Sequence, residues 1–128
     1  MARLINPGLG DYLDRLAILE LKIQHAPEDR ADHFRREKAA VLTKIQGSSQ
    51  VGFPIEEYTA LCVVNARIWR DEDKMADFAA TTATDLDLRT AADAGYLGID
   101  IWRLNRLRGK TVEAINAKVG DDRGQEKL

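Results

Sequence analysis

Apolar residues recur along almost the whole chain at the three- and four-residue spacing of α-helices. Residues 12–25 are apolar on two sides: one carries Tyr12, Leu13, Leu16, Leu19 and Ile23, and the other Ala17, Ile18 and Leu21. We therefore predict that this helix is central. Residues 28–46 have a single stripe, Ala31, Phe34, Val41, Leu42 and Ile45, and a charged opposite face, which predicts a peripheral helix.

Turn-forming residues divide this pattern into four helices. Residues 7–10 are predicted to be loop, with Asp11 as the cap of the first helix, and Pro27 separates the first helix from the second. Glycine and serine in 47–52 precede a third helix from Pro54 to about Phe78, and 80–84 read as a connection. The fourth helix is predicted over 88–119, with a bend at Gly95 and Gly98.

No alternating strand pattern is present, so the predicted fold class is all-α. We expect a single four-helix bundle-like domain over residues 1–128, with a long C-terminal helix. Residues 1–10 are expected to be an N-terminal loop and 120–128 a flexible tail.

Composition limits the function classes. The chain has 45% hydrophobic and 31% charged residues, with a formal net charge of −2, so we expect no broad basic face and no nucleic-acid partner. The apolar runs are too short for a bilayer span, and residues 1–10 lack a signal-peptide pattern, which predicts a cytoplasmic location without a membrane partner. The single cysteine, Cys62, excludes an intrachain disulfide and is predicted to be a packing residue.

Several polar residues occupy positions on the apolar stripes. Asn65 and Glu72 lie two turns apart in the third stripe, Arg108 is central in the fourth with Asn105 at its edge, and Glu20 neighbours Leu16 and Ile23 in the first. We expect these five side chains to point inward. Because a buried charge is costly unless paired, Arg108 is predicted to meet Glu72 or Glu20.

Two interpretations of this polar set stay open. It is either a structural network that fixes the helix register, or the binding site of a non-catalytic accessory domain. In the second case Arg108 binds a small anion, such as the phosphate of a nucleotide sugar, through its planar guanidinium, and Asn65 and Asn105 bind hydroxyl or amide groups.

An alternative interpretation is a magnesium site at Glu20, Glu72 and Asp73, as in helical hydrolases of nucleotides. Those enzymes pair Glu-x-x-Glu with Glu-x-x-Asp on facing helices, a spacing that this chain does not reproduce. Phosphate-binding loops, nucleophile elbows and metal-binding His-Glu-x-x-His pairs are also missing from the sequence. The sequence therefore leans away from catalysis.

The fourth helix has a second pattern. Gly95, Trp102, Gly109 and Asn116 recur every seven residues, with Gly98 and Asn105 alongside. Small residues allow two helices to approach closely, which indicates either packing within the chain around Trp102 or the seam of a homodimer. Trp69 is predicted to be a core residue, and His25 and His33 to be surface residues without a metal.

Three segments resemble a bacterial family of helical domains of unknown function. They are 10–23 (GDYLDRLAILELKI), 64–73 (VNARIWRDED) and Asn105 to Arg108 followed by Ile115-Asn116. The family pattern falls on Asp14, Glu20, Lys22, Asn65, Trp69, Glu72, Asp73, Asn105 and Arg108. Arg15, Ala17 and Arg106 replace the usual Lys, Thr and Asp. Because some members occur beside or fused to glycosyltransferases, the resemblance implies a context in glycan assembly.

Overall fold

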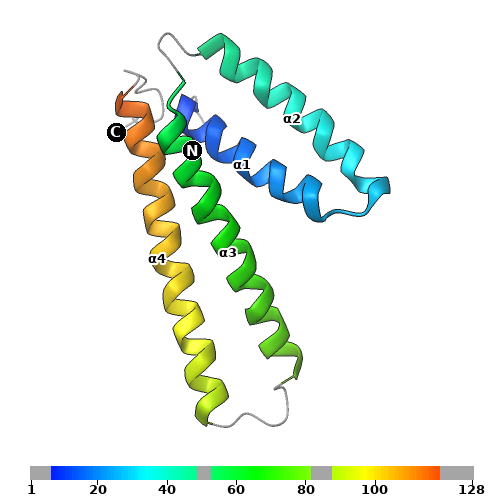
Figure 1. The fold of residues 1–128 in the computed structure, drawn as a ribbon, viewed down its shortest axis with the longest axis vertical. Helices are drawn as coiled ribbons and strands as arrows, with labels where there is room; N and C mark the ends of the chain where they lie inside the picture. Colours follow the sequence, from blue (N-terminus) through cyan, green and yellow to red (C-terminus); the bar gives the residue numbers. More distant parts are fainter. Residues whose placement is uncertain (1–6, 49–52, 82–87, 119–128) are drawn as a thin grey trace, which may run out of the picture.

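The computed structural model describes residues 7–48, 53–81 and 88–118, which form four α-helices and no strand (Figure 1). These are α1 (Leu9–His25), α2 (Glu28–Ser48), α3 (Ile55–Thr81) and α4 (Leu88–Lys118). The predicted all-α helical bundle with a long C-terminal helix is confirmed. The helix α4 is continuous through both glycines at which we expected a bend. The expected tail at 120–128 lies outside the described residues.

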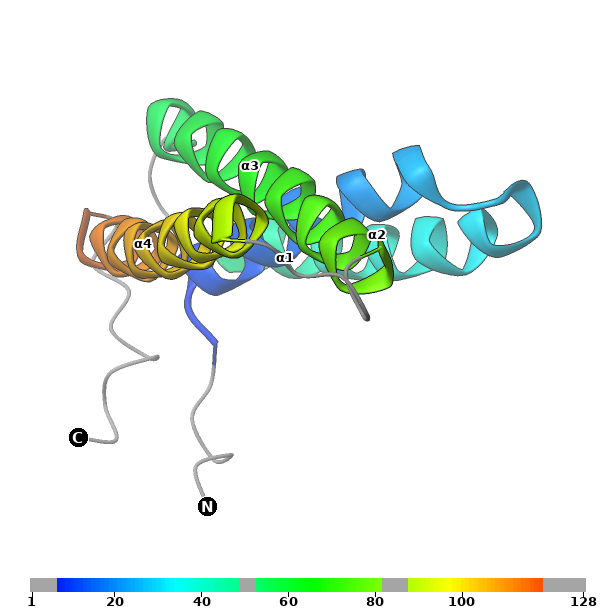
Figure 2. The same cartoon turned by 90° about the horizontal axis from the view of Figure 1, so that it is seen from below.

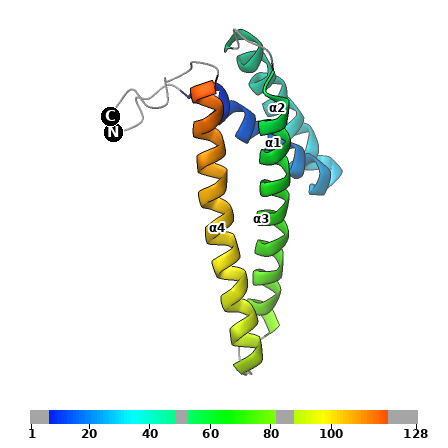
Figure 3. The same ribbon diagram turned by 60° about the vertical axis from the view of Figure 1, so that its left-hand side comes forward.

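The four helices form two hairpins of different length. The long antiparallel hairpin α3–α4 is crossed by α1 near the end where α3 begins and α4 finishes (Figures 1 and 3). Of the described helices, α2 contacts only α1, whereas α1 contacts all three others, which confirms its central position. The other half of α3–α4 projects beyond α1 and α2 (Figures 1 and 3), and its end lies in front of them when the molecule is seen from below (Figure 2).

The start of α1 differs from our prediction, because Leu9 and Gly10 belong to the helix and Gly8 is its cap. The amide of Gly8 donates to Asp11 Oδ2 at 3.0 Å, and the Gly8 carbonyl accepts from the amides of Asp11 and Tyr12. Asp11 therefore caps the helix from within its first turn rather than from the position before it. This extra turn brings Leu9 into the core, where it is buried.

The core lies where α1 crosses the long hairpin. Its main cluster of buried residues is Leu9, Leu13, Leu16, Ile45, Leu61 and Ile115, and a smaller cluster, Val64, Ile68 and Leu104, joins α3 to α4 below it. Leu13, Leu16 and Ile45 of these clusters belong to the predicted apolar stripes, whereas Leu9 was expected in a loop. The clusters fix the part of the hairpin that carries Asn65 and Arg108.

The face of α4 opposite the core is exposed and partly apolar. We call its residues the outer stripe of α4: Leu88, Ala92, Gly95, Ile99, Trp102, Arg106, Gly109 and Glu113, all exposed. Trp102 is 60% exposed, so the predicted alternative of packing within the chain around Trp102 is wrong. Asn116 does not belong to this stripe, because it is buried against α1.

In the described helices, no segment is long and apolar enough to cross a membrane.

Candidate functional site at the junction of three helices

Asp14 of α1, Asn65 of α3 and Arg108 of α4 meet in one hydrogen-bonded group, the polar junction. Asn65 is buried, and its Nδ2 donates to Asp14 Oδ1 at 2.9 Å and to the Leu61 carbonyl at 3.0 Å. Arg108 Nη1 donates to Asn65 Oδ1 at 3.4 Å, and its Nε lies 3.6 Å from Asp14 Oδ2. The inward position of Asn65 and its link to Arg108 agree with the prediction from the stripes.

The predicted partners of Arg108 are wrong, because the acid it meets is Asp14. Glu20 is exposed and pairs with Lys38 of α2 at 3.1 Å. Asp14 and Glu20 are six residues apart, which is about 240° around a helix at 100° per residue, so they face different neighbours. Glu72 is also exposed.

Glu72 and Asn105 lie on the same side of the hairpin as the junction, because they are seven residues from Asn65 and three from Arg108. The exposed amide of Asn105 donates to the Ile101 carbonyl of its own helix at 3.0 Å. On the same side, Trp69 is half-buried and stacks on the exposed His25 with ring centroids 4.9 Å apart. Four of the five predicted residues therefore lie on one side of the hairpin, where Asn65 is buried, and Glu20 is separate from them.

A pocket of about 350 Å³ opens beside the polar junction, between α1 and α4. We call it the α1–α4 pocket; its lining residues are Asp11, Asp14, Arg108, Gly109, Val112, Glu113 and Asn116. Arg108 keeps a third of its side chain exposed, and both of its contacts in the junction are long. Its remaining N–H groups are thus able to donate to a molecule in the pocket.

Two glycines close one end of this pocket by letting α1 approach α4. Asn116 Oδ1 accepts from the Gly10 amide at 2.6 Å, and Asn116 Nδ2 donates to Asp11 Oδ2 at 3.4 Å. A Cβ at Gly10 would lie 2.4 Å from the Val112 carbonyl oxygen, and one at Gly8 would lie 2.6 Å from Asn116 Oδ1. Sequence reasoning placed Asn116 on the wrong face and interpreted Gly8 and Gly10 only as loop residues.

A second polar group, below the junction, was missed in the sequence. Asp71 is only 3% exposed and its Oδ2 has no hydrogen-bond partner, while Arg67 Nη2 donates to both oxygens of Asp100 at 2.9 and 3.1 Å. A hydrogen bond to Asp100, together with burial, raises the pKa of Asp71; that bond and Arg67 lower the pKa of Asp100. Asp71 follows Val64 and Ile68 at helical spacing, so this spacing could have identified Asp71 as an inward-facing residue.

The three carboxylates of the alternative magnesium site do not form a ligand set. Glu20 faces α2, whereas Glu72 and Asp73 are exposed on α3. Within residues 7–48, 53–81 and 88–118, no group of three or more His, Cys, Asp or Glu side chains is placed to hold a metal ion.

Comparisons with protein-family models, with curated proteins and with solved structures found no match for this chain. The family resemblance of its three helical segments therefore stays a prediction.

Proposed function

We propose that this chain is a non-catalytic binding module that holds a small hydroxyl-rich molecule, such as the sugar part of a nucleotide sugar, in the α1–α4 pocket. The observation that carries the proposal is the pairing of donors and acceptors in the lining. Asp11, Asp14 and Glu113 offer acceptor oxygens, and Arg108 and Asn116 offer N–H donors. Hydroxyl groups both donate and accept, so a sugar suits this mixture.

The charge of the lining argues against a free anion as the preferred ligand, which changes the ligand expected from the sequence. Three carboxylates and one guanidinium line the pocket, and Asp14 already contacts Arg108. Like charges at short range are unfavourable, so a phosphate is expected to stay outside the pocket. The proposal keeps the cytoplasmic location and the role in glycan assembly that were expected from the sequence.

Thermal unfolding with a neutral monosaccharide, an amino sugar, a nucleotide sugar and inorganic phosphate tests the proposal. A ligand at 100 times its dissociation constant stabilises the folded state by about 2.7 kcal/mol. We expect sugars to raise the unfolding temperature and phosphate to have no effect. Glu113→Gln should weaken the shift, because Glu113 is an exposed pocket carboxylate, whereas Asp29→Asn on α2 should preserve it.

Two results would contradict this proposal. If no sugar stabilised the protein, the pocket would have only a structural role. If phosphate alone stabilised it and Arg108→Met removed the effect, the site would bind anions, as the sequence first indicated.

We propose a homodimer seam along the outer stripe of α4 as a second candidate role. The stripe exposes three large apolar residues, Leu88, Ile99 and Trp102. A Cβ at Gly95 or Gly109 would meet no atom within 4 Å. Trp102 stacks on Arg106 at 5.0 Å, and tryptophan and arginine are enriched at the energetic centres of interfaces.

A further inference from the structure

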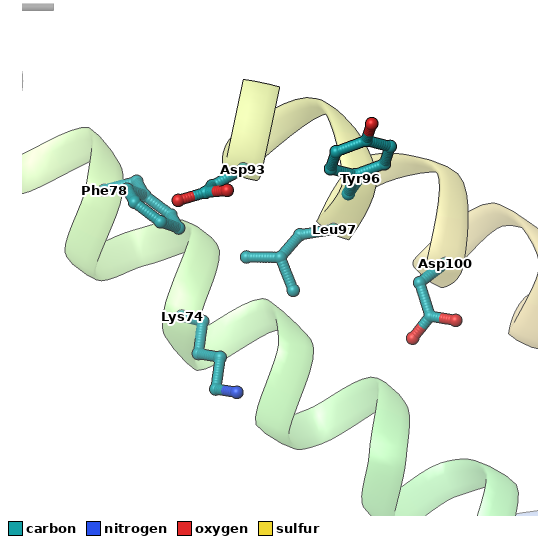
Figure 4. A pocket seen from close by; sticks show the side chains of 6 residues that line it. All are labelled: Lys74, Phe78, Asp93, Tyr96, Leu97 and Asp100. Carbon is teal, nitrogen blue, oxygen red and sulfur yellow. The ribbon is translucent and has the colours of Figure 1, made fainter. Parts of the chain in front are cut away.

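The projecting half of the α3–α4 hairpin carries a second pocket. Its volume is about 470 Å³, within the range of about 300–1,000 Å³ typical of small-molecule sites. Figure 4 shows its lining: Lys74 and Phe78 from α3, and Asp93, Tyr96, Leu97 and Asp100 from α4. It shares no lining residue with the α1–α4 pocket, so its role is independent of the proposed function.

The middle of this pocket is apolar. The side chain of Leu97 lies between the two helices, with the Phe78 ring on the α3 side and the Tyr96 ring on the α4 side (Figure 4). Phe78 and Leu97 are half-buried, and Tyr96 is 72% exposed. An apolar or aromatic group bound here would remove this exposed surface from water, which is favourable.

Two opposite charges border the apolar surface without partners of their own. Lys74 lies on α3 and Asp93 on α4, and neither makes an ion pair or hydrogen bond with any other residue that the structure describes. Asp100 differs, because Arg67 holds both of its oxygens. The available charges of the pocket are therefore one ammonium and one carboxylate, on opposite helices.

We propose that this pocket binds a small zwitterion with an apolar body, which is the chemistry of a free aromatic amino acid. The ammonium group of the ligand pairs with Asp93, its carboxylate pairs with Lys74, and its ring packs on Phe78, Leu97 and Tyr96. A ligand with a single charge forms only one of these two ion pairs, so it lacks the attraction of the second.

Three probes with a similar aromatic body separate the contributions of the two charges. They are L-phenylalanine, phenethylamine, which lacks the carboxylate, and 3-phenylpropionate, which lacks the ammonium. Binding is measured by calorimetry, and amide chemical shifts locate the site. We expect L-phenylalanine to bind about tenfold more tightly than either relative, with shift changes in α3 and α4 around the pocket.

Two exposed-site variants test the assignment of the charges. Lys74→Met should weaken L-phenylalanine about tenfold and remove its advantage over phenethylamine, whereas Asp93→Asn should remove its advantage over 3-phenylpropionate. Arg36→Met and Asp29→Asn, both on the surface of α2, are the matched controls and should change nothing. Unfolding temperatures establish that each variant is folded.

The proposal fails if L-phenylalanine does not bind up to its solubility limit, or if all three probes bind equally. It also fails if both pocket variants behave like their controls. Shift changes confined to α1 and the end of α4 would place binding in the α1–α4 pocket instead.

Discussion

At the scale of single residues, the carboxyl group of Asp71 has the clearest measurable consequence. Its pKa is raised by the hydrogen bond to Asp100 and by burial, so its proton stabilises the folded state. This contribution is complete below the pKa of Asp71 in the unfolded chain and is lost as pH rises through the raised folded pKa. The pKa of Asp100 is lowered, so its ionised carboxylate stabilises the folded state. This contribution is complete above the pKa of Asp100 in the unfolded chain and is lost as pH falls through the lowered folded pKa.

Asp71→Asn should remove this pH-dependent loss, because a carboxamide donates to Asp100 without needing a proton. Urea unfolding from pH 4 to pH 8 should show that the variant keeps its stability where the natural protein declines. We expect a gain of about 1–3 kcal/mol at the upper end, the cost of an unsatisfied buried group. Asp73→Asn, on the exposed side of α3, should follow the natural profile. Parallel pH profiles for Asp71→Asn and the natural protein would show that Asp71 carries no shared proton.

Breaking the polar junction is expected to destabilise the protein less than breaking a fully buried ion pair would. Arg108 is one third exposed, and its contacts with Asp14 and Asn65 are at the long end of the polar range. Solvent screening reduces the value of such a pair, so Arg108→Met should cost about 1 kcal/mol rather than the 3–5 kcal/mol of a buried pair. Chemical denaturation measures this cost, and a loss above 3 kcal/mol would mean that the junction is dry and tightly paired.

At the scale of helices, substitution of glycine by alanine is expected to destabilise the protein at Gly10 and to stabilise it at Gly109. Gly10→Ala places a Cβ against the Val112 carbonyl, so α1 and α4 must separate, at a cost of about 1–3 kcal/mol. Gly109→Ala meets no atom and removes a flexible residue from the middle of a helix, so it should stabilise by about 0.4–1 kcal/mol. Thermal unfolding of the two variants measures both effects. Equal destabilisation would show that the surroundings of Gly109 are also filled, as in an intermolecular seam.

The elements themselves were predictable because the signals for helices are local. The spacing of apolar residues, Pro27 and Pro54 gave four helices whose observed ends lie within three residues of those expected. The first turn of α1 was missed because Gly8 and Gly10 suggest a loop when only neighbouring residues are considered. These glycines are needed because α1 packs closely on Asn116 of α4. Asn116 is distant in the sequence, so no local pattern reveals this contact.

At the scale of the whole molecule, the outer stripe of α4 makes the oligomeric state the feature to measure. Sedimentation equilibrium should show a dimer if this stripe is a seam, and Trp102→Ala should shift it towards monomer by removing the largest side chain of the stripe. Tyr12→Phe, a small change on α1, is the matched control. A natural protein that stays monomeric at high micromolar concentration would exclude the homodimer role.

The composition of the candidate site was only partly predictable at this scale. Asn65 and Arg108 were found because they interrupt apolar stripes, a property of each helix alone. Asp14 was not chosen as the partner, because the angle at which α1 crosses the hairpin decides which of its two faces meets Arg108. Glu72 was expected to be inward because it lies two turns from Asn65 on the same stripe, yet it is exposed.

The contact between Gly10 and Asn116 also governs how the chain reaches its native state. It joins residues 106 positions apart, while each hairpin joins helices that are neighbours in sequence. Closing so long a loop carries a large entropic cost, so the two hairpins are expected to form early and dock late. Because the beginning of α1 touches the end of α4, a short linker between them gives a circular permutant with new ends at Ala26 and Pro27. In that permutant the slow long-range closure becomes a local turn.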